Sequence, residues 1–145
     1  MKNKRKGFSI VEVLVGIALI AIALIGLAQL FTLSVMNNLR ANDLSNATFL
    51  VQQEIDYLRS LTGPEMSTFP STARGEFNDE QLDLNQDGTI DYRRVTQVQA
   101  QAAGTGYDVF VLVFPPSQLG ATRSSLLLNP DNFKVKAQIH TVISR

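Results

Sequence analysis

The chain has 145 residues, of which 45% are apolar, so it is long enough for one modest domain but too short for two independent cores. Thirteen Lys and Arg residues balance thirteen Asp and Glu residues. A zero net charge removes any whole-chain argument for binding nucleic acid or acidic substrates. The sequence has no cysteine, which excludes disulfide bonds, thiolate catalysis and cysteine-ligated metals.

The amino-terminal segment has the length and composition of a membrane helix. Between residues 8 and 36 the only ionisable side chain is Glu12, and residues 13–28 contain no polar side chain. A bilayer core about 30 Å thick requires roughly 20 helical residues. Four cations precede the apolar run, and the first cation after it is Arg40. The positive-inside rule therefore places the amino terminus in the cytoplasm and the bulk of the chain outside.

A cleaved secretory signal peptide is the alternative, with an A-x-A-like site at residues 21–23. Two features disfavour it. The apolar run continues through Leu24, Ile25 and Leu27, whereas a leader turns polar near its cleavage site. In addition, Glu12 lies inside the run, where a carboxylate costs about 2.5–3.5 kcal/mol. Glu12 therefore needs a nearby cation.

Residues 6–15, Lys-Gly-Phe-Ser-Ile-Val-Glu-Val-Leu-Val, resemble the class III signal of type IV pilins and pseudopilins. The resemblance implies that a prepilin peptidase cuts after Gly7, methylates Phe8 and leaves the helix attached. It also implies that Glu12 pairs with the terminal amine of a neighbouring subunit. Glu12 lies four residues after Phe8, on the same helix face, so its carboxylate can meet an amine there.

Helix-favouring residues continue beyond the apolar run, and the absence of proline before Thr62 predicts one helix over residues 8–61. In its second half, apolar residues recur at spacings of three and four and predict one buried face: Leu44, Ala47, Val51, Ile55 and Leu58. Polar residues such as Gln52 and Glu54 mostly lie between them, and Gly63-Pro64 ends the pattern. Residues 47–60 also resemble the "AQ-x-x-IE-x-LR" region of PilV-type minor pilins.

After residue 64, three runs bounded by turn signals are predicted to be strands, at residues 92–98, 107–114 and 133–143. The second is almost continuously apolar and is expected to be the central strand. We therefore predict an α+β fold, in which a small antiparallel sheet packs on the outer half of the helix. The resemblance to type IV pilins implies the same fold, although this chain lacks the disulfide common in that family. The three leucines at 126–128 are expected to pack in the core, and the alternative is contact with a neighbouring subunit.

Residues 83–91 read D-x-N-x-D-G-x-x-D, which is the start of an EF-hand-like calcium loop. The pattern predicts a Ca²⁺ site whose ligands are Asp83, Asn85, Asp87, Thr89 and Asp91. The twelfth position holds Arg94 where a bidentate acid is expected, so Asp79, Glu80 or water would have to complete the shell. The alternative interpretation is a solvated turn without metal.

The sequence gives little support to an enzyme or a nucleic-acid-binding protein. The only histidine, His140, falls on the polar face of a predicted strand, and no nucleophile elbow, P-loop or dinucleotide fingerprint occurs. Arg93, Arg94, Lys134 and Lys136 do not make the basic, aromatic-bearing surface expected of a DNA-binding protein. We therefore predict no catalysis and no direct nucleic-acid binding.

Together these features predict a structural minor pilin of a type IV pilus system, incorporated in the pilus or priming its assembly. The predicted parts are a cleaved cytoplasmic leader (1–7), a hydrophobic transmembrane and assembly helix (8–36), its amphipathic half (37–62), and a β-rich head (63–145) with an acidic loop (76–91).

The family resemblance further implies three partners for the chain: the prepilin peptidase, other major and minor pilins that contact the helix, and the bacterial inner membrane. The carboxy-terminal domain would lie in the periplasm or outside, and the processed chain would join a fibre. A type II secretion pseudopilin and a calcium-dependent binding protein tethered by one helix are the alternatives.

Overall fold

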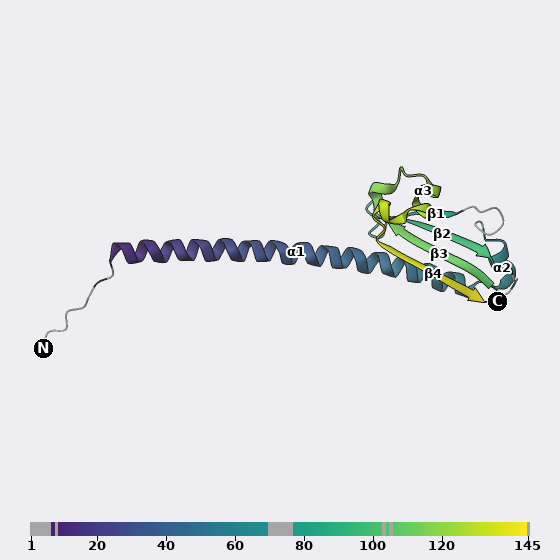
Figure 1. Ribbon diagram of the computed structural model, residues 1–145, viewed down its shortest axis with the longest axis horizontal. Helices are drawn as coiled ribbons and strands as arrows, with labels where there is room; N and C mark the ends of the chain where they lie inside the picture. The colour runs from purple at the N-terminus through teal and green to yellow at the C-terminus, as the bar shows by residue number, and fades with distance from the viewer. Residues whose placement is uncertain (1–6, 8, 70–76, 103, 105, 145) are drawn as a thin grey trace. The chain divides into compact units, whose positions relative to one another are not determined.

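The computed structural model describes residues 7, 9–69, 77–102, 104 and 106–144, and the chain forms two compact units, Met1–Ala41 and Asn42–Arg145. The helices are α1 (Ile10–Ser60), α2 (Gly63–Ser67) and α3 (Arg123–Leu128), with 3₁₀ helices η1 (Pro116–Gln118) and η2 (Pro130–Phe133). The strands are β1 (Asn78–Leu82), β2 (Tyr92–Ala100), β3 (Gly106–Phe114) and β4 (Ala137–Ser144) (Figure 1). The predicted α+β fold is confirmed.

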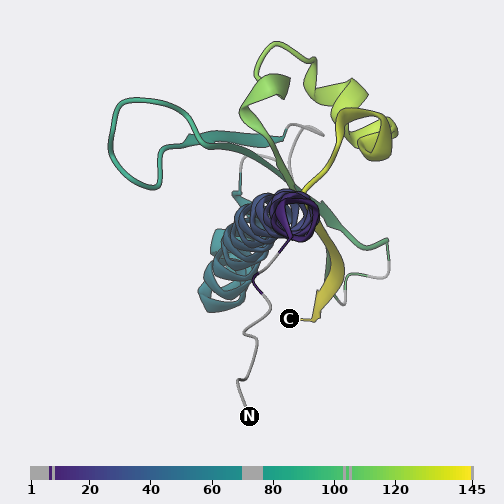
Figure 2. The ribbon, with the colours of Figure 1, turned by 90° about the vertical axis from the view of Figure 1, so that its left-hand side faces the viewer.

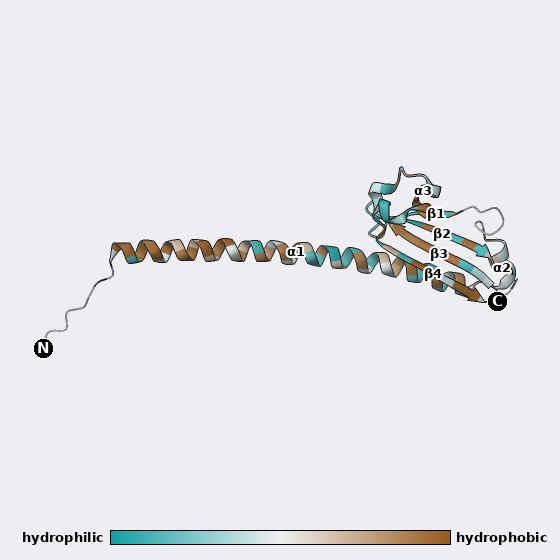
Figure 3. Cartoon of the chain, in the orientation of Figure 1, coloured by the Kyte–Doolittle hydropathy of each residue, from teal (hydrophilic) through white to brown (hydrophobic). Residues whose placement is uncertain are grey.

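The long helix predicted over residues 8–61 is seen as the 51-residue α1. In its first part, residues 10–41, no side chain is buried, and large apolar residues are exposed on every side. Figure 3 shows the amino-terminal part of this stretch as mostly hydrophobic, with hydrophilic patches further along. In the part of the chain that the structure describes, α1 is the one helix long and apolar enough to cross a membrane.

In the second unit, four antiparallel strands form one sheet in the order β1-β2-β3-β4. β3 lies between β2 and β4, which confirms the predicted central strand. One face of the sheet packs against α1 after Asn42, and α3 and η2 lie on the opposite face (Figure 2). The sheet therefore has an inner face, which meets the helix, and an outer face.

Alternation along each strand divides the apolar side chains between two cores. The inner core joins α1, α2 and the sheet, and its buried strand residues are Tyr92, Val98, Val109, Val111, Val113 and Ile143. The outer core lies between the sheet and α3, and its buried residues are Val95, Leu112, Phe114 and Leu126. Leu127 packs partly against this core, while Leu128 is 78% exposed. The prediction that all three leucines pack in the core is therefore wrong for Leu128.

The buried face of α1 differs from the predicted stripe at three positions. Leu44 is 55% exposed, whereas Leu50, which the pattern omitted, is buried together with Ala47, Val51, Ile55 and Leu58. Glu54, expected between the apolar positions, is only 3% exposed. It lies on the buried face because the basic side chain of Arg94 meets it there.

The strand boundaries also required two corrections. β1 was not predicted, because its sequence Asn-Asp-Glu-Gln-Leu has no apolar alternation. The last strand begins at Ala137 rather than at residue 133. The preceding residues Pro130–Phe133 form η2, and Lys134 adopts a left-handed conformation with φ 55°, which interrupts an extended chain.

Candidate functional site

The predicted processing site lies just outside the start of α1. Gly7 is exposed and non-helical, and Ser9 caps the helix that begins at Ile10. The hydroxyl of Ser9 accepts a hydrogen bond from the Val11 amide at 3.3 Å, and its carbonyl accepts one from the Glu12 amide at 3.0 Å. A serine at this position satisfies amides that have no partner in the first helical turn. Gly7 is thus exposed and precedes the helix, while Phe8 lies outside the described residues.

Ser9 was not singled out from the sequence, although a serine directly before an apolar helical run is a recognised start signal. Glu12 occupies the first turn of α1 and is exposed. A carboxylate in this turn is favoured by the partial positive charge of the helix amino terminus. The pairing of Glu12 with a terminal amine involves Phe8 and stays a prediction.

Comparison with known protein families bears on this segment. Residues 2–28 match a family model described as the prokaryotic N-terminal methylation motif. The amino terminus is that of a type IV pilin-like protein. The match covers Gly7, Glu12 and most of the apolar run, which supports a prepilin-type signal on a membrane-anchoring helix. No curated protein and no solved structure matches the chain.

The predicted calcium loop connects β1 to β2 and closes on itself through its own side chains. The carboxylate of Asp83 accepts hydrogen bonds from the amides of Asp87 at 3.3 Å and Gly88 at 2.8 Å. Asp87 accepts the amide of Thr89 at 2.8 Å and also its hydroxyl, and these bonds hold the pKa of Asp87 below its usual range. Asp91 accepts the Leu84 amide at 2.9 Å. Gly88 has φ 85°, a conformation that favours glycine.

The loop oxygens therefore stabilise a tight turn. Over the described ranges, no three His, Cys, Asp or Glu side chains lie close enough together to hold a metal ion. Asn85 and Thr89 add neutral oxygens to the set, and both lie in the loop. Calcium binding stays a prediction.

The structure contradicts the prediction that Asp79 or Glu80 completes a metal shell. Both acids lie on β1, and each pairs with an arginine of the neighbouring strand: Asp79 with Arg93 and Glu80 with Arg94. A carboxylate that already binds a guanidinium has its charge compensated there, so neither acid is a free ligand.

The Arg94 side chain links the inner face of the sheet to α1. It contacts the carboxylate of Glu54 at 2.9 Å, hydrogen-bonds Glu80, and donates to the carbonyl of Leu50 at 3.2 Å. Thr96 donates to Glu54 at 3.2 Å. Burial raises the pKa of Glu54 despite the opposing charge of Arg94. These contacts connect β2 to the buried face of α1.

On the outer face of the sheet, the Arg93 side chain links β2 to β1 and to the segment between β3 and α3. Its guanidinium makes two parallel bonds of 2.9 Å to Asp79, and its Nη1 lies within hydrogen-bonding distance of the carbonyls of Gln118, Leu119 and Ala121. Arg123 also donates to Asp79, at 2.7 Å. The hydrogen bonds from Arg93 hold the pKa of Asp79 below its usual range, although burial opposes them. The segment between β3 and α3 is thereby attached to the sheet.

A third polar cluster lies where α1 enters the second unit. Tyr92, the first residue after the acidic loop, donates a hydrogen bond of 2.6 Å to Asp43, which also pairs with Lys136. Burial and the bond to Asp43 raise the pKa of Tyr92 to about 12. Burial alone would raise the pKa of Asp43, but Lys136 and Tyr92 together lower it.

Sequence reasoning missed these three clusters. The available signal was the spacing of the charges, because Asp79-Glu80 and Arg93-Arg94 are separated by 14 residues across a predicted turn. On an antiparallel hairpin such pairs can face each other.

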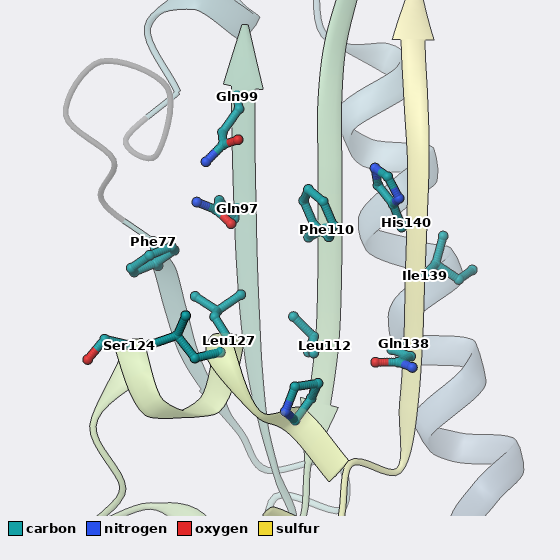
Figure 4. A pocket seen from close by; sticks show the side chains of 12 residues that line it. Phe77, Gln97, Gln99, Phe110, Leu112, Ser124, Leu127, Gln138, Ile139 and His140 are labelled. Carbon is teal, nitrogen blue, oxygen red and sulfur yellow. The ribbon is translucent and has the colours of Figure 1, made fainter. Parts of the chain in front are cut away.

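His140, expected to be an exposed strand residue, is exposed on the outer face of β4. Its ring stacks on that of Phe110 with the ring centroids 4.0 Å apart. The two rings line a groove of about 780 Å³ on the outer face, together with Gln97, Gln138 and Leu127 (Figure 4).

Proposed function

We propose that this pilin-like chain is a structural minor pilin of a type IV pilus system, which enters or primes the fibre after cleavage between Gly7 and Phe8. The prepilin peptidase and other major and minor pilins are its proposed partners. The second unit would lie in the periplasm or outside the cell. The chain would contribute surfaces and no catalysis.

The observation that carries this proposal is the methylation motif joined directly to an exposed apolar helix. The motif covers residues 2–28, and α1 begins within it at Ile10. The large apolar side chains from Ile10 to Met36 are exposed in the isolated chain. Such a surface is stable only in lipid or against other apolar helices. A subunit that moves from membrane to fibre needs both environments.

Processing is tested by mass spectrometry of the amino terminus of the protein purified from its host membrane. The proposal expects a chain that begins at methylated Phe8. An intact leader would support a simple membrane tether, and a mature terminus near Leu24 would support a secretory leader. Either result would overturn the assignment.

Assembly is tested with Glu12→Ala. We expect normal processing and normal folding of residues 42–145, but reduced recovery of the variant in sheared fibres, because the apolar helix loses its one charged contact. Asp56→Ala is the matched control, since this acid also lies on α1 and its side chain is 76% exposed. Equal recovery of the two variants would argue against pairing through Glu12.

A type II secretion pseudopilin is the second candidate, and the acidic loop is the feature that favours it, because calcium recurs in that group. Deletion of the gene distinguishes the two machines. Loss of surface fibres with normal protein secretion supports the minor pilin, whereas loss of secretion with normal fibres supports the pseudopilin.

We further propose that the acidic loop binds Ca²⁺ through Asp83, Asn85, Asp87, Thr89 and Asp91. All five supply oxygen, the donor that Ca²⁺ prefers, and a carboxylate oxygen that accepts one amide retains a second lone pair. Isothermal titration of the full chain in detergent should show calcium heat that Asp87→Asn abolishes and Asp131→Asn, an exposed acid in η2, preserves. Absent heat in the unmodified chain would identify a metal-free turn.

A further inference from the structure

The last strand of the sheet has an open edge. In the sheet order β1-β2-β3-β4, the described residues give β4 a strand neighbour on one side only. β4 pairs with β3 through eight consecutive residues, from Ala137 opposite Val113 to Ser144 opposite Gly106, without a bulge. In an antiparallel pair, about half of the backbone N–H and C=O groups of each strand point away from the partner. Those of β4 form a regular row along the edge.

The two edges of the sheet differ in their protection. β1 has five residues, and its Asp79 and Glu80 are held in ion pairs with the next strand. β4 has eight residues and contains no proline, Lys, Arg, Asp or Glu. Its residue Val142 is 52% exposed. Sheet edges are normally protected from pairing by short length, charge, proline or bulges, and β4 has none of these devices.

A hollow lies beside each face of β4. On the outer face, the groove of about 780 Å³ includes Gln138 and His140 of β4 and the neighbouring Phe110 (Figure 4). On the inner face, a hollow of about 290 Å³ lies between β4 and α1 and is lined by Gln52, Ile55, Asp56, Arg59, Ile139 and Thr141. Successive side chains of an added strand would point alternately toward these two sides.

The charges that line the two hollows indicate which kind of chain segment could bind along this edge. The lining of the outer groove includes no Asp, Glu, Lys or Arg. In the inner hollow, the carboxylate of Asp56 lies 3.8 Å from the guanidinium of Arg59, so the two charges compensate each other. An uncharged strand with apolar residues at alternate positions therefore complements this edge better than a charged one.

We propose that the edge of β4 binds an extended, uncharged segment of a different polypeptide, which adds a fifth strand to the sheet. Main-chain hydrogen bonds would supply affinity, and the two hollows would select its alternate side chains. This inference does not depend on the assignment as a minor pilin.

A second copy of the chain fits this edge less well. Its β1 is three residues shorter than β4 and carries two acids.

The test uses the full chain in detergent micelles and a synthetic peptide of alternating valine and threonine with lysine at each end. Hydrogen–deuterium exchange should become about tenfold slower over Ala137–Ser144 when the peptide is added, while exchange over Asn78–Leu82 stays unchanged. A peptide of the same length with aspartate in place of valine should give no protection. Equal protection by the two peptides, or none by either, would overturn the proposal.

Two variants test the site itself. Val142→Lys places a charge on the exposed side of the edge and should abolish protection, whereas Leu84→Lys, an exposed leucine in the loop between β1 and β2, should retain it. Unchanged exchange of the β3 amides shows that each variant is folded. If Val142→Lys unfolds the sheet, the proposal is tested by the comparison of the two peptides on the unmodified chain alone. If exchange of the β4 amides slows as the protein concentration rises, with no peptide present, the edge binds a second copy of the chain and the proposal of a different polypeptide is wrong.

Discussion

Residues 10–41 bury no side chain, whereas residues 42–145 bury two apolar cores and several charged groups that are paired with one another. In the first unit the apolar side chains of α1 face outward, and the one acid, Glu12, lies among them. In the second unit every buried side-chain nitrogen or oxygen that the structure describes has a hydrogen-bond partner. The part of α1 before residue 42 therefore has no stabilising contacts from buried side chains of this chain, whereas the part after it does.

This difference indicates where each unit finds its stability. The described part of residues 42–145 packs its cores and pairs its buried polar groups within the chain, so substitutions of those buried residues should change the free energy of unfolding. Residues 10–41 require contacts from outside the chain, so substitutions there should change membrane insertion or assembly instead. Four comparisons of variants, taken from the largest expected effect to the smallest, test this division.

Arg94→Met should have the largest effect. The change leaves Glu54 buried without its cation, and loss of one partner of a buried pair costs about 3–5 kcal/mol in unfolding free energy. Chemical denaturation of the full chain in detergent measures this cost. The double variant Arg94→Met/Glu54→Gln should recover part of it, and a single-variant cost below about 1 kcal/mol would show that the pair is not structurally important.

Leucine-to-alanine substitutions compare the two units directly. Leu58 is fully buried in the inner core, so Leu58→Ala should reduce the unfolding free energy of the second unit by about 3 kcal/mol. Leu24 is exposed, so Leu24→Ala should leave that free energy unchanged and reduce recovery in sheared fibres. Similar changes in unfolding free energy for the two variants would contradict the proposed division between the two units.

Asp79→Asn should cost about 2 kcal/mol near neutral pH, because it removes charge-assisted bonds to Arg93. The pKa of Asp79 is lowered in the folded chain. Its carboxylate therefore stabilises the fold fully at pH values above its unfolded pKa of about 3.9. This stabilisation is lost as the pH falls through the lower pKa of the folded chain. The acid unfolding of Asp79→Asn should therefore show a shallower loss of stability below about pH 4. Asp56→Asn, at an exposed site, should retain the slope of the unmodified chain.

Tyr92→Phe should cost about 1 kcal/mol, the usual contribution of one hydrogen bond, here the bond to Asp43. The pKa of Tyr92 is raised to about 12, so this stabilisation is complete below the unfolded value of about 10 and is lost as the pH rises through 12. Between about pH 10 and pH 12, the unfolding free energy of Tyr92→Phe should therefore fall less steeply with pH than that of the unmodified chain. Tyr57→Phe, at an exposed position, should resemble the unmodified chain.

The regular parts of the fold could be predicted because their patterns are local. Apolar composition and the lack of proline located α1 to within two residues at its start and one at its end, and the apolar run at residues 108–114 identified the central strand. β1 could not be found in this way. Its residues are selected by pairing with Arg93 and Arg94 across the hairpin, and a search for apolar alternation does not detect such partners.

The site residues that belong to local motifs could also be predicted, whereas those that depend on distant partners could not. Gly7, Phe8 and Glu12 belong to a short motif that can be read along the chain, and the match over residues 2–28 supports that interpretation. The position of Ser9 as the helix cap follows from local rules as well. The burial of Glu54 could not be predicted, because it depends on Arg94, which is 40 residues away in sequence.

The attachment of the segment after β3 has a consequence for how this protein can diverge. Arg93 holds that segment through the main-chain oxygens of Gln118, Leu119 and Ala121, and it contacts none of their side chains through these bonds. Every amino acid provides the same oxygen. Relatives can therefore change the exposed chemistry of this stretch freely while its path is preserved, provided that the arginine and its aspartate are inherited together.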